Sequence, residues 1–149
     1  MKYLKKYNEH ITPLIFKKEY DEDYLELKAY IKDNEVGKIT TEIMFDPHLY
    51  ILGDELGEDE IYNIFPEDII VKIEYISIDD DFKGLGIAKE LMTEALSTMK
   101  DDGYTQFFLN ASPMGFGGLS LNTLVEFYKK FGFKEIINQG NNVLMYLVV

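Results

Sequence analysis

The pattern of apolar and polar positions divides the chain into strands, helices and turns. Alternating apolar residues predict strands over residues 24–31 and 38–45, which the turn-rich segment 32–37 joins into a hairpin. The run IIVKIEYISI, residues 69–78, is apolar and rich in β-branched side chains, as expected of a central strand. Residues 11–20 fit either a strand or an irregular helix.

Two stretches instead repeat apolar residues at the spacing of an α-helix. The first covers residues 86–101 and stops before Gly103. The second follows Ser120, a good N-cap residue, places Leu121, Leu124, Val125, Tyr128 and Phe131 on one face, and ends at Gly132.

Three further strands are expected over residues 104–111, 133–138 and 142–149, the last two joined by a turn at Gly140 and Asn141. The C-terminal order is strand, helix, strand, helix, strand, strand, with short connections. We therefore expect a mixed α/β fold in which residues 1–149 form a single domain.

Composition narrows the possible chemistry. The chain has no cysteine, which excludes disulfides, thiol nucleophiles and cysteine-bound zinc. His10 and His48 are its only histidines, so we expect neither a multi-histidine metal site nor a Ser-His-Asp triad. The net charge of −12 disfavours nucleic acid as a partner. Because we find neither a signal peptide nor an apolar run of membrane-spanning length, we expect a cytoplasmic protein.

The segment 46–68 is unusually acidic, with eight carboxylates and no lysine. It is either a solvated excursion on the surface or a binding loop, and the sequence leaves both interpretations open.

The most informative motif is DFKGLGIAKELM, residues 81–92, at the turn between the central strand and the first helix. Unpaired N–H groups and the helix dipole make a helix N-terminus a binding site for phosphates. Gly84 and Gly86 allow a ligand to approach the backbone closely, and Ala88 keeps the start of the helix narrow.

Other motifs fit this segment less well. A P-loop sequence is absent, and the dinucleotide fingerprint fails because Lys89 stands where glycine or alanine belongs. An EF-hand loop finds acceptable residues at positions 1, 3, 6 and 12, namely Asp79, Asp81, Gly84 and Glu90. However, Lys83 occupies position 5 and a strand precedes the loop, which disfavours calcium.

The segment Lys83-Gly84-Leu85-Gly86-Ile87-Ala88 resembles the motif [Q/R]-x-x-G-x-[G/A] of the GNAT superfamily of N-acetyltransferases, with lysine at the first position. A second GNAT signature, Y-x-x-x-G-F, is matched by Tyr128, Gly132 and Phe133. The resemblance covers residues 69–149 well and the hairpin 24–45 more loosely. Where many members carry an asparagine seven residues before the tyrosine, this chain has Leu121, and Asn122 lies one residue away.

The resemblance implies a fold and a co-substrate. The fold would be a mixed, mostly antiparallel central sheet with helices packed on both faces. Acetyl-CoA would bind with its pyrophosphate on residues Lys83, Gly84, Leu85, Gly86, Ile87 and Ala88. The central strand would splay from its neighbour, leaving backbone groups of Ile76 and Ile78 for the pantetheine arm.

The resemblance also suggests chemical roles. A primary amine would attack the thioester directly, and Tyr128 would protonate the departing thiolate, unless it is only a core aromatic. Glu74 would act as the base or merely pair with a lysine, and Asn110 would face the acceptor. The acidic residues Glu58, Asp59 and Glu60 would attract a cationic acceptor or serve solubility alone.

The sequence thus predicts an N-acetyltransferase whose acceptor is a small-molecule amine, a protein lysine or a protein N-terminus. A non-catalytic GNAT module that binds acyl-CoA or a protein, and an acidic decoy of nucleic-acid-binding proteins, are the alternatives. Whether the chain is a monomer or a homodimer is left open.

Overall fold

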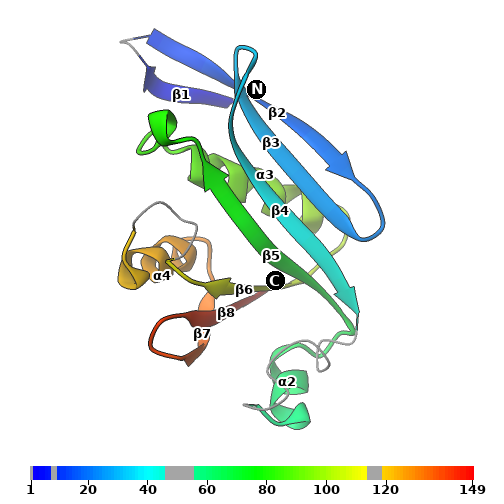
Figure 1. The fold of residues 1–149 in the computed structure, drawn as a ribbon. Helices are drawn as coiled ribbons and strands as arrows, with labels where there is room; N and C mark the ends of the chain where they lie inside the picture. Colours follow the sequence, from blue (N-terminus) through cyan, green and yellow to red (C-terminus); the bar gives the residue numbers. More distant parts are fainter. Residues whose placement is uncertain (1, 8–9, 46–55, 114–118) are drawn as a thin grey trace.

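The computed structural model describes residues 2–7, 10–45, 56–113 and 119–149. Within them eight strands form one sheet in the order β1-β2-β3-β4-β5-β6-β8-β7 (Figure 1). All neighbouring strands are antiparallel except β5 and β6, which run parallel. The mixed, mostly antiparallel sheet predicted from the sequence is therefore confirmed.

The N-terminal half is a meander of four strands. They are β1 (Lys2–Tyr7), β2 (His10–Tyr20), β3 (Tyr24–Ile31) and β4 (Asn34–Phe45). The segment that fitted either a strand or a helix is thus a strand, β2. The turn predicted over residues 32–37 was too long: β4 already begins at Asn34 because Val36 is buried in the core, and Lys32 makes the tight turn with a φ of 55°.

The C-terminal half follows the predicted order, with each boundary within three residues of the expected one; the largest difference is at the second helix, which ends at Lys129 rather than at Gly132. Its elements are β5 (Ile69–Ile78), the short 3-10 helix η1 (Asp80–Phe82), α3 (Ile87–Asp101), β6 (Gln106–Ala111), α4 (Leu121–Lys129), β7 (Lys134–Asn138) and β8 (Val143–Val148). Ser120 caps α4 as predicted, because its Oγ accepts a hydrogen bond of 3.2 Å from the backbone N–H of Thr123.

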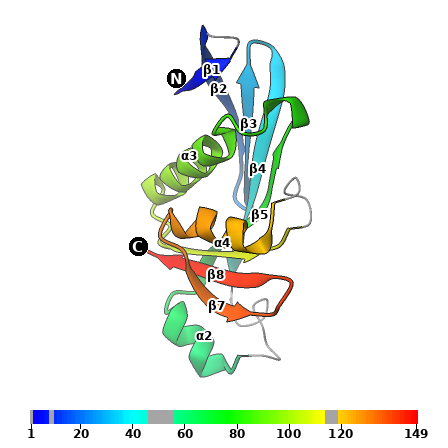
Figure 2. The ribbon, with the colours of Figure 1, turned by 90° about the vertical axis from the view of Figure 1, so that its left-hand side faces the viewer.

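Helices cover the sheet on both faces, as predicted. Helices α3 and α4 share one large core with strands from both halves (Figure 2). On the opposite face, a smaller core surrounds helix α2 (Glu58–Ile64), which the sequence analysis did not anticipate. There Ile61 and Phe65 pack on residues of β5, β6 and β8, namely Ile70, Phe108 and Leu144.

A buried glutamine fixes the start of β5. The side chain of Gln106 on β6 is fully buried and makes three hydrogen bonds of 2.9 Å to the backbone of Glu67 and Ile69. The side-chain nitrogen donates two of these hydrogen bonds and the side-chain oxygen accepts the third, so neither polar atom of the buried amide lacks a partner. Gln106 therefore ties the segment after α2 to the parallel strand β6.

Candidate active site

The turn between β5 and α3 exposes backbone N–H groups. Gly84 and Gly86 have φ values of 79° and 82°, a region that only glycine adopts without strain. The first bond of the α3 ladder runs from Glu90 N to Gly86 O at 3.1 Å, and no side chain caps the helix. The N–H groups of the first turn therefore lack intrahelical partners and, with the helix dipole, form an anion site.

A cavity of about 330 Å³ opens at this turn. Seven of the eight predicted cofactor-binding residues line it, namely Ile76, Ile78, Lys83, Gly84, Gly86, Ile87 and Ala88. Leu85, the eighth, packs instead against the main core. Phe82, Leu119 and Phe127 add apolar walls that the sequence analysis did not assign. A β-carbon built on Gly84 or Gly86 would meet no protein atom within 4 Å, so the space above both glycines is free for a ligand.

Lys83 is the cationic group at this cavity that matches the first motif position. Its Nζ lies 2.6 Å from Asp80 Oδ1; the Asp80 side chain is largely exposed and that of Lys83 is 41% exposed. The hydrogen bond and the charge of Lys83 lower the pKa of Asp80 below its usual value. Asp80 therefore stays ionised and holds the lysine beside the cavity, where a phosphate would compete with it for the ammonium group.

Gly37 on β4 packs closely against residues that line the cavity, although the sequence analysis placed it in a turn. A β-carbon there would lie 2.9 Å from Ile78 Cδ1, 3.0 Å from the carbonyl oxygen of Ser77 and 3.3 Å from Ile87 Cγ2. Only glycine therefore lets β5 and the first turn of α3 pack this closely. A glycine inside a β-branched stretch is itself a signal of close backbone approach.

Strands β5 and β6 separate beside the cavity. Their parallel pairing covers Val71–Ile73 of β5 and Phe107–Leu109 of β6, and β5 then continues to Ile78 without pairing to β6. The splay implied by the family resemblance is thus present. Ile76 and Ile78 lie in this unpaired part of β5 and line the cavity, so their backbone groups on the β6 side are available to a ligand.

Tyr128 lies in the main core, where only 7% of its surface is exposed. Its ring packs edge-on against Phe127 and Phe133, with centroid distances of 5.3 and 6.2 Å. Burial raises the pKa of Tyr128 to about 12, so the hydroxyl remains a donor at physiological pH. Phe127 lines the cavity, whereas Tyr128 is not among the described residues that do.

The predicted base and the residues predicted to bind the acceptor lie in three separate places. Glu74 is exposed on β5, where its Oε1 lies 3.5 Å from Lys72 Nζ, so the lysine pairing considered from the sequence exists. Asn110 ends β6 and lines a second cavity of about 370 Å³ beside the β7–β8 turn. Asn142, on the other wall of this cavity, donates a hydrogen bond of 2.8 Å to Asn110 Oδ1.

The acidic residues of α2 lie far from the first cavity. Asp59 and Glu60 are exposed on α2, which precedes the start of β5, whereas the cavity lies at the end of that strand (Figure 1). Nine steps along a strand correspond to roughly 30 Å. The side chain of Glu58 and most of the acidic segment, residues 46–55, lie outside the described residues.

Among the residues that the structure describes, no group of three or more histidine, aspartate or glutamate side chains is placed to hold a metal ion. None of the helices within these residues has the length and apolar character needed to cross a bilayer.

Solved structures share this fold. PaiA N-acetyltransferase from Thermoplasma acidophilum, in complex with coenzyme A, has a TM-score of 0.59 and 19% identity over 85% of this chain, which spans 62% of PaiA. The ribosomal-protein-S18-alanine N-acetyltransferase of Escherichia coli has a TM-score of 0.60 and 13% identity, with 87% and 72% of the two chains covered. Arabidopsis thaliana NAA60 with acetyl-CoA has a TM-score of 0.58 and 16% identity, with 87% and 77% covered.

At these identities the similarity shows the fold alone. No curated protein sequence matches the chain. The model of the acetyltransferase (GNAT) domain, however, matches residues 64–143, which contain the glycine turn, the splayed strands and Tyr128. This chain belongs to the GNAT acetyltransferase family.

Proposed function

We propose that the chain, acting as a single domain, transfers the acetyl group of acetyl-CoA to a primary amine while both substrates are bound. One observation carries the proposal: a glycine turn at the N-terminus of α3 opens on a cavity beside the unpaired end of β5. Such a turn suits a pyrophosphate, and the strand offers backbone groups to the pantetheine arm.

The reaction needs no covalent enzyme intermediate. The amine nitrogen forms a bond to the carbonyl carbon of the thioester, the carbon–sulfur bond breaks, and the nitrogen loses a proton. A backbone N–H of β5 beyond Ile73, in the stretch that holds Ile76 and Ile78, would polarise the carbonyl oxygen. Glu74 would accept the proton of the amine, directly or through a water molecule.

Tyr128 would donate a hydrogen bond to the departing thiolate. With a pKa of about 12 it is a weaker acid than a thiol, so complete transfer of its proton is unfavourable. Stabilisation of the thiolate by a hydrogen bond from the neutral phenol is therefore the role that fits the burial of Tyr128 best.

The acceptor would be a small-molecule amine, a protein lysine or a protein N-terminus. The E. coli enzyme that shares the fold acts on the alanine of a ribosomal protein, which supports including peptides among the candidates. The net charge of −12 favours an acceptor that carries positive charge.

A panel of amines tests the proposal through release of free CoA. The panel should contain polyamines, aminoglycosides, amino acids, lysine peptides and peptides with a free N-terminal alanine, each at several concentrations with acetyl-CoA. The proposal predicts CoA release that depends on one class of amine. Binding of acetyl-CoA without release above the hydrolysis background would favour the non-catalytic module, and failure to bind acetyl-CoA would leave the acidic decoy.

A further inference from the structure

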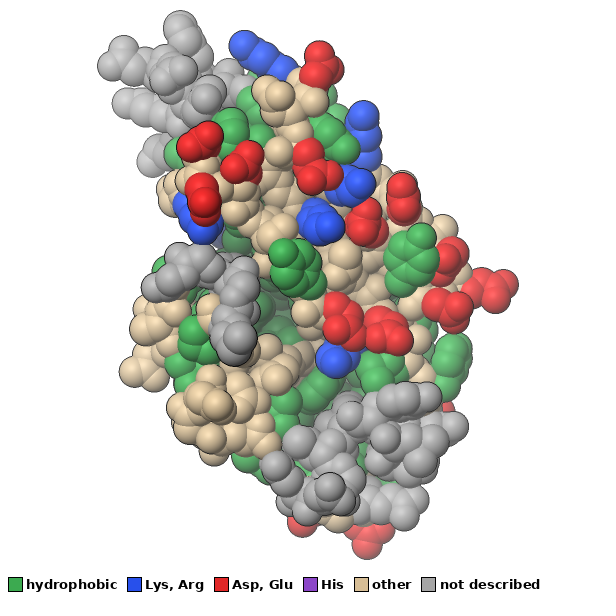
Figure 3. Space-filling model, viewed as in Figure 1, with side chains coloured by type: hydrophobic (Ala, Val, Ile, Leu, Met, Phe, Trp, Pro, Cys, Tyr) green, Lys and Arg blue, Asp and Glu red, His purple; other side chains and the backbone are tan. Residues whose placement is uncertain are grey.

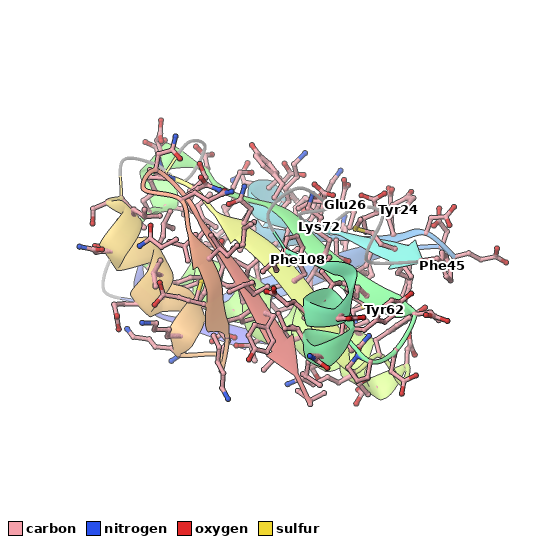
Figure 4. The ribbon with its side chains drawn as sticks, turned by 90° about the horizontal axis from the view of Figure 1, so that it is seen from below. Tyr24, Glu26, Phe45, Tyr62, Lys72 and Phe108 are labelled. Carbon is pink, nitrogen blue, oxygen red and sulfur yellow. The ribbon has the colours of Figure 1, made fainter. Side chains whose placement is uncertain are left out.

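The face of the sheet opposite α3 carries two asparagine side chains next to the splay. Leu109 and Ala111 of β6 point into the main core, so Asn110 between them lies on the other face. Phe108, two residues before Asn110, belongs to the smaller core around α2 on that same face (Figure 4). In Figure 3 this face is hollowed near its centre, beside a group of charged side chains. The cavity that Asn110 lines, about 370 Å³ in volume, therefore adjoins the face away from α3 and α4.

Asn110 stands where β5 and β6 part. The last pair of their parallel register is Ile73 with Leu109, so Glu74 and Asn110 are the next residues of the two strands. Side chains at such neighbouring positions rise from strands that are roughly 5 Å apart. The carboxylate of Glu74 and the amide of Asn110 thus flank the point at which the splay opens.

A bulge keeps Glu74 on this face. Ile73 and Ile76 both point into the main core, although they are three residues apart along β5. The two residues between them, Glu74 and Tyr75, are both exposed. Glu74 Oε1 lies 3.5 Å from the Nζ of Lys72, two residues earlier on the same side of the strand. The carboxylate is therefore held at the edge of the splay rather than in the core.

The two asparagines of the cavity form one hydrogen-bonded unit, the amide pair Asn110–Asn142. Asn142 Nδ2 donates to Asn110 Oδ1 at 2.8 Å and to Gln139 Oε1 at 2.6 Å. A side-chain amide has two donor positions on its nitrogen, and both positions of Asn142 are used. The pair is left with one donor, Asn110 Nδ2, and one acceptor, Asn142 Oδ1, neither of which makes a side-chain hydrogen bond within the described part of the chain.

The cavity is polar but neutral. The described residues that line it are Asn110, Ser112, Pro113, Asn141 and Asn142. The second ammonium group of a polyamine, or the carboxylate of a free amino acid, would lose water here without gaining an opposite charge, which is unfavourable. A neutral group with one donor and one acceptor matches the free atoms of the amide pair. The charge of such an acceptor is confined to its amine, which lies next to Glu74.

We propose that the amide pair binds the backbone of a peptide acceptor, so that the amine that attacks acetyl-CoA is the free N-terminus of a peptide or protein. Asn110 Nδ2 donates to the C=O of the second residue of the acceptor, and the N–H of that residue donates to Asn142 Oδ1. In an extended chain these two groups point to the same side, as they do in an antiparallel ladder. The inference rests on the proposed function, in which Glu74 receives the proton of the amine.

The spacing of the two strands suits this arrangement. Consecutive residues of an extended chain are about 3.5 Å apart. The amine of the first residue and the N–H of the second can therefore lie beside Glu74 and the amide pair at the same time, across neighbouring strands roughly 5 Å apart.

Two matched acceptors test the proposal in the wild type. They are alanyl-alanine amide and its ester analogue, in which oxygen replaces the N–H of the second residue. Both carry one amine, so the net charge of the protein acts on them alike. With acetyl-CoA, we expect kcat/KM for the ester to be about tenfold lower, because one hydrogen bond is lost and Asn142 Oδ1 stays unpaired.

Asn110→Asp isolates the amide pair in the protein. An aspartate oxygen still accepts the hydrogen bond from Asn142, but the second oxygen replaces the donor Nδ2. We expect kcat/KM for alanyl-alanine amide to fall by about tenfold relative to that for spermidine, with KM for acetyl-CoA unchanged. Asn138→Asp is the control, since it adds the same charge to the same hairpin and keeps the acceptor of the 2.9 Å bond from Gly140 N–H.

A binding measurement without an acetyl donor separates the two claims. The side-chain ¹H–¹⁵N signals of Asn142 should shift when alanyl-alanine amide is added with CoA, in the wild type and in Asn138→Asp, and much less in Asn110→Asp. Equal kcat/KM for the amide and the ester, or turnover of spermidine without turnover of the peptide, would overturn the inference and leave the proposed function standing. Shifted signals without turnover of any amine would refute the proposed function and support the peptide site.

Discussion

At the scale of single residues, the hydroxyl of Tyr128 is the group whose proposed role is easiest to isolate. Tyr128→Phe keeps the ring that packs against Phe127 and Phe133 and removes only the hydrogen-bond donor. We expect kcat to fall by about 10²-fold while the affinity for acetyl-CoA holds, because the donor acts on the leaving thiolate. Tyr146→Phe is the matched control, since Tyr146 packs in the smaller core on the other face.

The pKa of Tyr128 adds a prediction about pH. Because burial raises this pKa to about 12, the phenol stays protonated at every pH at which the fold is expected to be assayed. Ionisation of Tyr128 should therefore cause no decline in the kcat of the wild type between pH 8 and about pH 10. In this range the pH profiles of kcat for the wild type and for Tyr128→Phe should have the same shape. A basic limb in this range that disappears in the variant would show that Tyr128 ionises far more readily than its burial implies.

At the scale of elements, Gly37 tests how β4, β5 and α3 are held together. Gly37→Ala places a methyl group 3.0 Å from the backbone oxygen of Ser77, and a backbone atom cannot move aside as a flexible side chain can. We expect the free energy of unfolding, measured in urea, to fall by about 1–3 kcal/mol, as in other overpacked sites. The affinity for acetyl-CoA should fall as well, because Ile78 and Ile87 line the cavity.

Gly57→Ser is the control for this change. A β-carbon at Gly57 meets no atom within 4 Å, and serine is a favoured residue at the N-cap of a helix such as α2. Stability and affinity should both stay near the wild-type values. Equal losses in the two variants would show that Gly37 has no special place in the packing.

Elements with one strong pattern could be predicted from the sequence, and elements with mixed signals could not. The run at residues 69–78 gave β5 its correct ends because apolar, β-branched residues fill it. Helix α2 was not predicted because the segment is dominated by acidic residues, so the helical spacing of Ile61 and Phe65 did not stand out. Both of these side chains are buried in the smaller core. The bulge between Ile73 and Ile76 was not predicted, because strict alternation would have exposed Ile76, whereas both isoleucines are buried in the main core.

The site was predictable to the extent that it is local. The glycine turn and the residues of β5 are close in sequence, so the motif identified the residues that now line one cavity. Neighbours on distant strands, such as Gly37 with Ile78 and Glu42 with Lys72, depend on register and on the bulge. A single sequence carries little information on either.

At the scale of the whole molecule, the position of α2 limits what its acidic residues can do. Asp59 and Glu60 come before β5, which begins at Ile69, and Glu74 lies five residues further along this strand. Five residues of a strand span roughly 17 Å. Exposed charges act over about 30 Å at 0.01 M salt and about 8 Å at 0.15 M. For Asp59→Asn/Glu60→Gln we therefore expect kcat/KM for a cationic acceptor to fall several-fold at the lower salt concentration and to match the wild type at the higher.

Steady-state kinetics at both salt concentrations checks this expectation. An equal loss at both would indicate direct contact between α2 and the acceptor, because contact is less sensitive to screening. No loss at low salt would mean that these carboxylates serve solubility alone.

The central claim, that the turn before α3 binds acetyl-CoA, is tested most directly by calorimetry on the wild type, Gly86→Ala and Gly103→Ala. Both glycines have positive φ values, 82° and 94°, and open space at the β-carbon, so both substitutions should cost about 1–2 kcal/mol of stability. Gly86 lines the cavity, whereas Gly103 does not. The account predicts that the wild type binds acetyl-CoA, that Gly103→Ala binds it equally well, and that Gly86→Ala binds it at least about tenfold more weakly. A wild type that does not bind acetyl-CoA at millimolar concentration, or equal affinity in the two variants, would contradict it.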